Sequence, residues 1–304
     1  MKTIYLDFCH SGPKMPKQEN YFYRLLTKRF DVQLVDQPDF LIIGTEGRFR
    51  EDIYTCTKIF YTYEHYLPDF GKHDYALTCN YLDDPRHYRL PIYVHFGLGG
   101  PETLIKHPGE LEAIMAQKTK FCALVTGNVT TPTTKTRTNF FHKLSKYKKV
   151  DSGGCALNNI GQVITRDRKR EFLQPYKFSI AFENESRVGY TSEKIFDAMQ
   201  GRGVPLYWGN PRVKDEFNPK SFLNYFDFES EDALIEKIIE LDQDDAKYFE
   251  YLKEPYFYNN EPSEAFNEMK QLDFFEEIFS KPITPVSQRR SFFFGRWILV
   301  TKDR

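Results

Sequence analysis

Glu193 and Lys194 are adjacent charged residues at the predicted start of a helix, where side chains can act on a bound anion. The positive end of a helix dipole suits the Glu193 carboxylate but opposes the Lys194 ammonium. A bound anion would resolve this conflict, because the unpaired N–H groups and the dipole at a helix N-terminus favour negative charge. The alternative is a solvated lysine on a surface helix, and local physics alone leaves both interpretations open.

The elements on either side place these two residues at a ligand-binding edge. Residues 178–182 alternate in the manner of a strand, and residues 206–208 predict a second strand. The segment between them predicts a helix that begins at Thr191 or Ser192 and ends near Gly201. Such a strand-helix-strand unit binds its ligand beyond the carboxyl ends of the strands.

Two charged residues from earlier parts of the chain could also do chemistry. Glu64 follows the apolar run 59–63, so it lies at the carboxyl end of a predicted strand, where a carboxylate can act as a base or simply be solvated. Arg137 lies in a polar loop at the start of a helix predicted for residues 137–146. Its planar guanidinium could bind a diphosphate through two parallel hydrogen bonds, and the alternative is an ordinary surface arginine.

The polar stretch resembles a known family signature. The sequence FENESRVGYTSEKIFDAM at 182–199, followed by VPLYWGNP at 204–211 and FNPKSFLNYFDF at 217–228, is similar to that of the α1,3/α1,4-fucosyltransferases that use GDP-fucose. The segment IFYTYEHYLPDFGKHDYAL at 59–77 is similar to a second family segment, although Leu67 stands where the family usually has a serine before the proline. By this resemblance the chain is identified as a bacterial-type member of glycosyltransferase family 10.

The resemblance implies a role for each candidate residue. Glu64 matches the proposed general base, and Tyr61 matches a tyrosine that faces the acceptor. Glu193 matches the carboxylate that binds the ribose hydroxyls, and a carboxylate suits this role because it accepts two hydrogen bonds. The positions that match donor-binding residues are Arg137, Asn184, Tyr190, Glu193 and Lys194.

The implied reaction is inverting transfer of L-fucose from GDP-β-L-fucose to an acceptor hydroxyl, such as O3 of N-acetylglucosamine in N-acetyllactosamine. A helix N-terminus with Arg137 and Lys194 would stabilise the leaving diphosphate, so no cofactor is required and a divalent metal would at most stimulate. The expected partners are GDP-fucose and an acceptor oligosaccharide or glycoconjugate. Two alternatives stay open, a transferase of the same architecture that uses another nucleotide sugar and a catalytically silent glycan-binding protein.

The order of predicted strands and helices indicates an α/β fold. The resemblance implies the GT-B type, with two Rossmann-like domains facing across a cleft. We predict an acceptor-side domain at residues 1–115 and a GDP-fucose-binding domain at residues 116–263, with the segment from about 264 to 304 packing back on the first domain. The strands predicted for the first domain are residues 3–8, 31–35, 39–44, 58–63 and 75–78, and residues 222–228 predict a further strand in the second domain.

Composition and charge exclude several classes of function. The 304 residues suffice for two domains, and a net charge of −1 argues against nucleic acid as a partner. The five scattered cysteines lack any C-x-x-C pair, which argues against a disulfide framework or a zinc site. Without a signal peptide or a membrane-length apolar run, we predict a cytoplasmic location. The basic aromatic residues 288–304 could either contact the membrane surface peripherally or pack on the protein.

Asp242 and Asp244 form a D-x-D triplet, which in another transferase architecture would hold a divalent metal. The triplet lies between two predicted helices rather than after a strand. We therefore interpret it as a helix-ending and capping cluster, and we predict no metal ligands in this chain.

Overall fold

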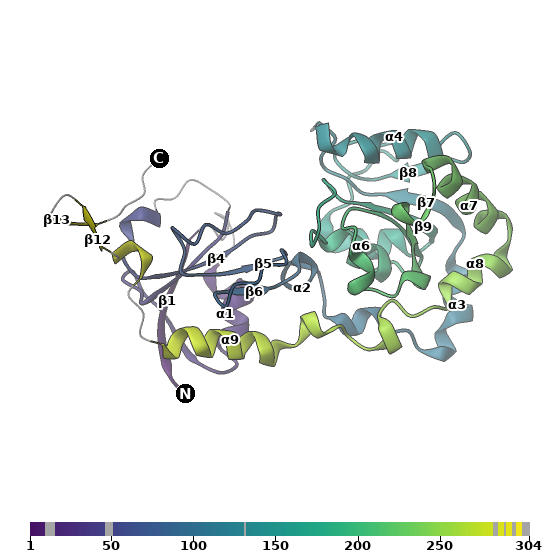
Figure 1. Ribbon diagram of the computed structural model, residues 1–304. Coiled ribbons are helices and arrows are strands. Elements are labelled where there is room, and N and C mark those ends of the chain that lie inside the picture. The colour runs from purple at the N-terminus through teal and green to yellow at the C-terminus, as the bar shows by residue number, and fades with distance from the viewer. Residues whose placement is uncertain are drawn as a thin grey trace. The chain divides into compact units, whose positions relative to one another are not determined.

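The computed structural model describes residues 1–9, 16–45, 51–130, 132–281, 285–288, 290–293 and 296–299. The chain divides into two compact units, one formed by Met1–His95 with Asn267–Arg304 and the other by Phe96–Phe266 (Figure 1). The first boundary therefore falls earlier than residue 115. Helix α3 (Leu111–Gln117) belongs to the second unit rather than the first.

Within the described residues, the first unit contains a parallel sheet with strand order β2-β1-β3-β4-β5-β6. The inner strands are buried along almost their whole length, as expected for a parallel sheet covered on both faces. The predictions of five strands are confirmed, and the sixth strand, β6, was not predicted. The strands are β1 (Thr3–Cys9), β2 (Asp31–Leu34), β3 (Phe40–Ile43), β4 (Thr57–Tyr61), β5 (Tyr75–Thr78) and β6 (His87–Arg89).

The last long helix of the chain, α9 (Glu268–Ser280), packs on this first sheet. Its Phe275 is fully buried and contacts Phe22 of α1 (Tyr21–Leu26), with ring centroids 5.9 Å apart. Apolar residues recur along α9 at helical spacing, so one face of the helix can enter the core while the rest stays solvated. The part of the C-terminal segment that forms α9 thus returns to the first unit, as expected from the sequence.

The second unit contains another parallel sheet, with strand order β11-β10-β9-β7-β8 among the described residues. Side chains on one face of this sheet share a core with helices α4, α7 and α8. The strands are β7 (Lys120–Leu124), β8 (Val150–Ser152), β9 (Tyr176–Phe182), β10 (Val204–Trp208) and β11 (Leu223–Asn224). The helices are α3, α4 (Lys135–Leu144), α5 (Lys169–Leu173), α6 (Glu193–Gln200), α7 (Glu231–Gln243) and α8 (Asp245–Leu252), and the short α2 (Ile92–Phe96) lies at the boundary of the units.

The connections of β7 and β9 create a switch point in this second sheet. These strands are neighbours, but β7 continues through α4 to β8 on one side, whereas β9 continues through α6 to β10 on the other. Figure 1 shows α4 and α6 on different sides of the sheet. Ligands of open α/β sheets bind in the crevice that such a reversal leaves at the carboxyl ends of the strands.

Two regions differ from the sequence prediction or fall outside it. The strand predicted for residues 222–228 is much shorter, because β11 covers two residues and a 3-10 turn follows at Tyr225–Asp227. In the C-terminal segment the backbone forms an antiparallel pair, β12 (Arg290–Phe293) with β13 (Arg296–Leu299). The prediction for the basic aromatic side chains of 288–304 lies outside the described residues. In the part of the chain that is described, no helix combines the length and apolar character needed to cross a bilayer.

Candidate active site

A cavity of about 250 Å³ opens at the switch point of the second sheet. Its wall includes the ends of β7 and β9 and the first turn of α6. Four of the residues predicted from the sequence line it, and they come from three separate stretches of the chain. They are Arg137, Asn184, Glu193 and Lys194.

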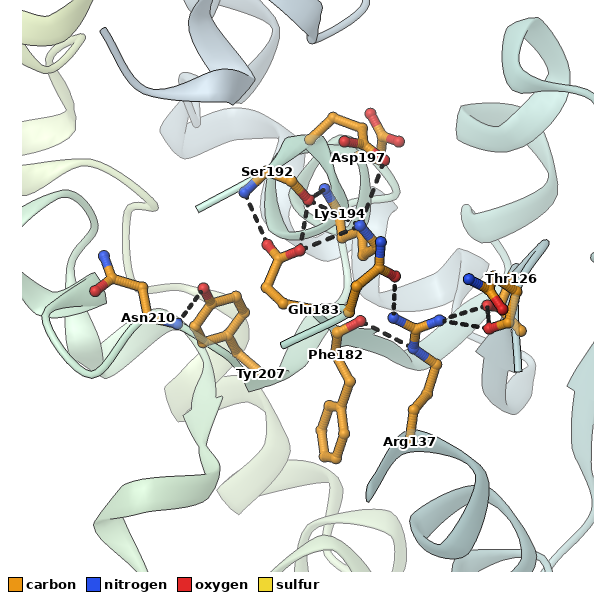
Figure 2. Close-up of polar contacts among 12 residues, drawn as sticks. Thr126, Arg137, Phe182, Glu183, Ser192, Lys194, Asp197, Tyr207 and Asn210 are labelled. Carbon is orange, nitrogen blue, oxygen red and sulfur yellow. Dashed lines mark hydrogen bonds and ion pairs between the residues drawn. The ribbon is translucent and has the colours of Figure 1, made fainter. Parts of the chain in front are cut away.

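Arg137 projects from the first turn of α4 and is almost completely buried. Its Nε donates to the carbonyl of Phe182 at 3.0 Å, and its Nη2 donates to Asn184 Oδ1 at 2.8 Å. Its Nη1 donates to Thr126 Oγ1 at 2.6 Å and to the Asn128 carbonyl at 3.1 Å (Figure 2). Of its five N–H groups, the described residues satisfy four. A two-bond fork onto a diphosphate would therefore require one of these bonds to break.

The N-terminus of α6 is held by a carboxylate of the protein itself. Glu183, fully buried at the end of β9, accepts from the backbone N–H of Ser192 at 2.8 Å and from its hydroxyl at 2.6 Å. Its Oε2 also accepts a hydrogen bond from Lys194 Nζ at 3.1 Å. Figure 2 shows these two side chains pointing toward each other. The opposition between the Lys194 ammonium and the helix dipole is thus offset within the protein, without a ligand.

The ionised forms of these groups support one another. Burial disfavours the Lys194 ammonium, but the carboxylates of Glu183 and Glu193 outweigh it and raise the pKa of Lys194. Burial likewise disfavours the Glu193 carboxylate, yet the ammonium groups of Lys194 and Lys169 lower its pKa to about 2. Burial lowers the pKa of Arg137, although the carboxylates of Glu183 and Glu193 act to raise it. All three side chains are therefore charged near neutral pH.

A second pair lies one turn further along α6. Lys169, the first residue of α5, lines the cavity and donates to Asp197 Oδ2 at 2.8 Å. Asp197 is buried, and its Oδ1 has no partner among the described residues. The predictions did not include Lys169. Only contacts between residues far apart in the sequence reveal it, because nothing in the local spacing of α5 distinguishes Lys169 from Arg168 or Arg170.

Tyr190 is the predicted donor-binding residue that does not line the cavity. It is buried to 1% exposure in the loop before α6. Asn210 and Tyr207 hold this loop from behind, because the Asn210 amide donates to Thr191 Oγ1 at 2.9 Å while Tyr207 Oη accepts from the Asn210 N–H at 3.0 Å (Figure 2). The surroundings of Tyr190 therefore suit a residue that orders the loop better than one that touches a ligand.

Glu64 and Tyr61 belong to the first unit. Glu64 follows β4, as predicted, and its backbone N–H donates to Thr62 Oγ1 at 3.0 Å, which fixes the turn that leaves the strand. The side chain of Glu64 is partly exposed. A carboxylate at the carboxyl end of a central parallel strand can meet a ligand there.

The prediction that Tyr61 contacts an acceptor directly does not agree with its position. Its side chain is 1% exposed and packs edge to face on Phe22, with ring centroids 4.9 Å apart, and on Tyr63 at 5.4 Å. Its hydroxyl accepts a long hydrogen bond of 3.5 Å from Asn20 Nδ2. Every residue of β4 is buried, because the sheet is covered on both faces, and Tyr61 belongs to the core of the first unit.

The D-x-D triplet has the structural role that the sequence predicted. Helix α7 ends at Gln243, and the Asp244 carboxylate caps α8 by accepting from the backbone N–H groups of Ala246 and Lys247, both at 3.1 Å. Asp242 accepts from Tyr147 Oη at 2.9 Å and from Lys148 Nζ at 3.1 Å. Elsewhere in the described residues, no group of three or more His, Cys, Asp and Glu side chains is placed to hold a metal ion.

Two family models match this chain. One, described as the C-terminal part of glycosyltransferase family 10 (fucosyltransferase), matches residues 115–276. The other, described as the N-terminal domain of alpha-(1,3)-fucosyltransferase FucT, matches residues 6–96. The first match contains the whole cavity, and the second contains Glu64 and Tyr61.

Similar proteins of known sequence include fucosyltransferases from distant organisms. Alpha-(1,3)-fucosyltransferase FucT of Helicobacter pylori is 30% identical over 288 residues, which cover 80% of this chain and 59% of that protein. The 3-galactosyl-N-acetylglucosaminide 4-alpha-L-fucosyltransferase FUT3 of Bos taurus is 30% identical over 169 residues, or 55% of this chain and 45% of that protein. The chain therefore spans about half the length of these relatives.

Solved structures agree with the sequence matches. A crystal structure of an α1,3-fucosyltransferase with GDP-fucose superposes with a TM-score of 0.76 at 26% identity and covers 94% of this chain and 93% of that one. A crystal structure of an α1,3-fucosyltransferase with GDP gives a TM-score of 0.75 at 27% identity and covers 93% of this chain and 92% of that one. The two Rossmann-like α/β units are of the GT-B type, as predicted. This chain belongs to glycosyltransferase family 10, the fucosyltransferases.

Proposed function

We propose that this chain is an inverting fucosyltransferase that moves L-fucose from GDP-β-L-fucose to a hydroxyl of an acceptor glycan. The observation that carries the proposal is the cavity at the switch point of the second sheet, where Arg137, Glu193 and Lys194 come together. Family membership supports the reaction class. The solved α1,3-fucosyltransferases with GDP-fucose and with GDP support the donor.

The second unit would hold the donor. Lys194 and the first turn of α6 would bind the diphosphate, and Arg137 would add its charge and one remaining N–H group. The side-chain amide of Asn184 can donate to the same phosphates, because its contact with Arg137 uses only Oδ1. Glu193 would accept hydrogen bonds from the ribose hydroxyls, and Tyr190 would order the loop from behind.

The first unit would supply the acceptor side and the base. The Glu64 carboxylate takes the proton of the acceptor hydroxyl. The oxygen of that hydroxyl attacks the anomeric carbon of fucose from the face opposite the diphosphate. The bond between that carbon and the β-phosphate oxygen breaks, and GDP leaves with the electron pair, so the β-linked donor gives an α-linked product. A general base of this kind accelerates a reaction by about 10²–10⁴-fold. Preorganised cations at the developing phosphate charge supply further stabilisation.

The acceptor that we propose is N-acetyllactosamine or a related glycan, with transfer to O3 of N-acetylglucosamine. The test is a panel of nucleotide sugars and glycan acceptors, with products identified by mass and their linkages by fragmentation. We expect fucose transfer from GDP-fucose and an α1,3 linkage. Transfer of another sugar would instead support a different nucleotide-sugar transferase, and acceptor binding without any GDP release would support a glycan-binding protein.

We propose that the reaction requires no cofactor and that divalent metal at most stimulates it. Lys194 and Arg137, with the first turn of α6, can offset the charge of the leaving GDP, which is the task a metal ion performs in other transferases. Activity is therefore expected to persist in excess EDTA. A complete loss of activity that added metal restores would contradict this proposal.

The location of the protein is also a proposal. We propose that it acts in the cytoplasm and that the basic aromatic residues 288–304 either contact an anionic membrane surface or pack on the protein. Co-sedimentation with vesicles of anionic phospholipid distinguishes the two roles. Membrane contact predicts binding that is lost in a chain truncated after residue 287, and packing predicts no binding by either protein.

A further inference from the structure

Lys169 is the cation of the cavity with the most unused hydrogen-bond donors. Its side chain is 15% exposed, and within the described residues its ammonium has one partner, Asp197 Oδ2 at 2.8 Å. An ammonium carries three N–H groups, so two are available to a ligand. Arg137 retains one N–H, and Lys194 already donates to Glu183 and to Ser192 Oγ, at 3.1 and 3.0 Å.

The position of Lys169 indicates which part of a nucleotide it meets. Lys194 lies in the first turn of α6, whereas Lys169 binds Asp197 one turn later, about 5 Å further along the helix axis. Apolar side chains line the cavity beside Lys169, at Leu173 of α5 and at Ala198 of α6. The cavity therefore has a charged end at the helix N-terminus and, one turn away, an end with apolar walls where the Lys169 ammonium is held by the buried Asp197 carboxylate.

A nucleoside diphosphate fits this order of groups. If the phosphates lie at the helix N-terminus, as in the proposed function, and the ribose lies at Glu193, the base reaches the end that holds Lys169. The apolar walls suit the flat faces of a base, and a lysine is a common partner of the O6 and N7 acceptors of guanine. Adenine presents an amino group in place of O6, so it would place a donor against the ammonium.

We propose that Lys169 selects guanine in the donor by donating to O6 and N7, and that Asp197 is the positioning residue that holds its ammonium at the cavity wall. This inference rests on the proposed function, because it takes the place of the phosphates and ribose from it. It adds a residue that determines which nucleotide the protein accepts, a choice that Arg137, Glu193 and Lys194 do not make because phosphates and ribose are common to all nucleotides.

The experiment measures the affinity of GDP, GMP and ADP by calorimetry for the wild-type chain and for Lys169→Met. We expect GDP and GMP to lose affinity by the same factor, about 10-fold or more, while ADP changes less than threefold. Lys169→Arg keeps two donors for O6 and N7 and should retain the preference for GDP over ADP. Asp197→Asn should reduce that preference without abolishing GDP binding, an effect on selectivity that a purely structural role would not produce.

Arg168→Met is the matched control, because Arg168 is the adjacent residue and its side chain is 66% exposed. It should leave the preference for GDP over ADP unchanged. Equal losses for GDP and ADP in Lys169→Met, or no loss at all, would overturn the inference, because the contact would then be to phosphate or absent. A wild-type chain that does not bind GDP would contradict the proposed function itself, so the two failures are distinct.

Discussion

Glu183 determines how Lys194 can lie at the positive end of α6. The buried carboxylate accepts from Ser192 twice and from Lys194 once, so it offsets both the helix dipole and the ammonium. From the sequence alone, a bound anion could resolve that conflict, and a solvated surface lysine was the alternative. The structure supplies an internal anion, and a phosphate that binds there must join a site whose charges already balance.

Replacing Lys194 by alanine is therefore expected to affect stability as well as binding. The Glu183 carboxylate would stay buried without its cationic partner, which costs about 1–3 kcal/mol of unfolding free energy. GDP affinity should fall in the same variant. Urea unfolding and calorimetry with GDP measure the two effects.

The double variant Glu183→Gln, Lys194→Ala separates these two effects. A neutral amide needs no cation, so the double variant should recover part of the stability lost by Lys194→Ala but none of the GDP affinity. Unchanged unfolding free energy in Lys194→Ala would contradict the role assigned to the Glu183–Lys194 pair.

The sequence predicted part of the cavity at the level of residues. Its motif placed Asn184, Glu193 and Lys194 at one strand end, and they do line the cavity with Arg137. It could not show that four of the five Arg137 N–H groups are used within the protein, two by backbone carbonyls and two by side-chain oxygens, because those partners come from separate stretches of the chain. Burial of Tyr61 depends on how the sheet is covered, and no local pattern reveals that covering.

At the scale of elements, one buried lysine joins the C-terminal ends of two helices. Lys118 follows α3, and its Nζ donates to the carbonyl of Gln174 after α5 at 2.6 Å and to that of Gly201 after α6 at 2.7 Å. Helix ends leave carbonyls without partners, so this side chain satisfies groups that would otherwise be buried unpaired. The contact also anchors the end of α6 that lies away from the cavity.

Burial gives this contact a pH dependence. Burial, with a further contribution from Arg202, lowers the pKa of Lys118 to about 7, whereas the ordinary value is 10.5. Between these values the unfolded chain binds a proton that the folded chain does not, so raising the pH through this range favours the folded state. Lys118→Met removes this titration and leaves two carbonyls without a donor.

We expect the melting temperature of Lys118→Met to be lower than that of the wild type, by an amount that increases from pH 7 to pH 9. Thermal unfolding at several pH values measures it. Lys146→Met, at an exposed position in the same unit, is the control and should follow the wild type. A difference that stays constant over this pH range would mean that Lys118 does not titrate there.

Helix α9 predicts a second effect at this scale. Phe275 is fully buried between Phe22 and Phe279, so Phe275→Ala removes a large core side chain and should cost about 3–5 kcal/mol. Met269→Ala on the same helix, where the side chain is 60% exposed, should cost far less. Equal stabilities of the two variants in urea unfolding would show that α9 is not part of the first core.

The elements themselves were largely predictable. Long apolar strands such as β1 and β9 give clear alternation, and helices such as α6 and α7 show both periodicity and capping residues. β6 escaped prediction because three residues contain too little pattern. β11 was predicted too long, because the aromatic residues after it favour a strand locally but form a 3-10 turn in the fold.

At the scale of the whole molecule, the candidate residues are divided between the two units. Glu64 follows a strand of the first sheet, whereas the cavity with Arg137, Glu193 and Lys194 belongs entirely to the second unit. The proposed reaction therefore assigns the base to one unit and the donor to the other. Replacing Glu64 should therefore change transfer and leave nucleotide binding intact.

The most direct test is Glu64→Gln, with GDP affinity and fucose transfer measured on the same preparation. We predict unchanged GDP affinity and transfer reduced by about 10²–10⁴-fold, because an amide cannot take the proton of the acceptor hydroxyl. Asp83→Asn, which neutralises an exposed carboxylate of the same unit, should change neither. Wild-type transfer by Glu64→Gln, or loss of GDP binding in that variant, would contradict the account.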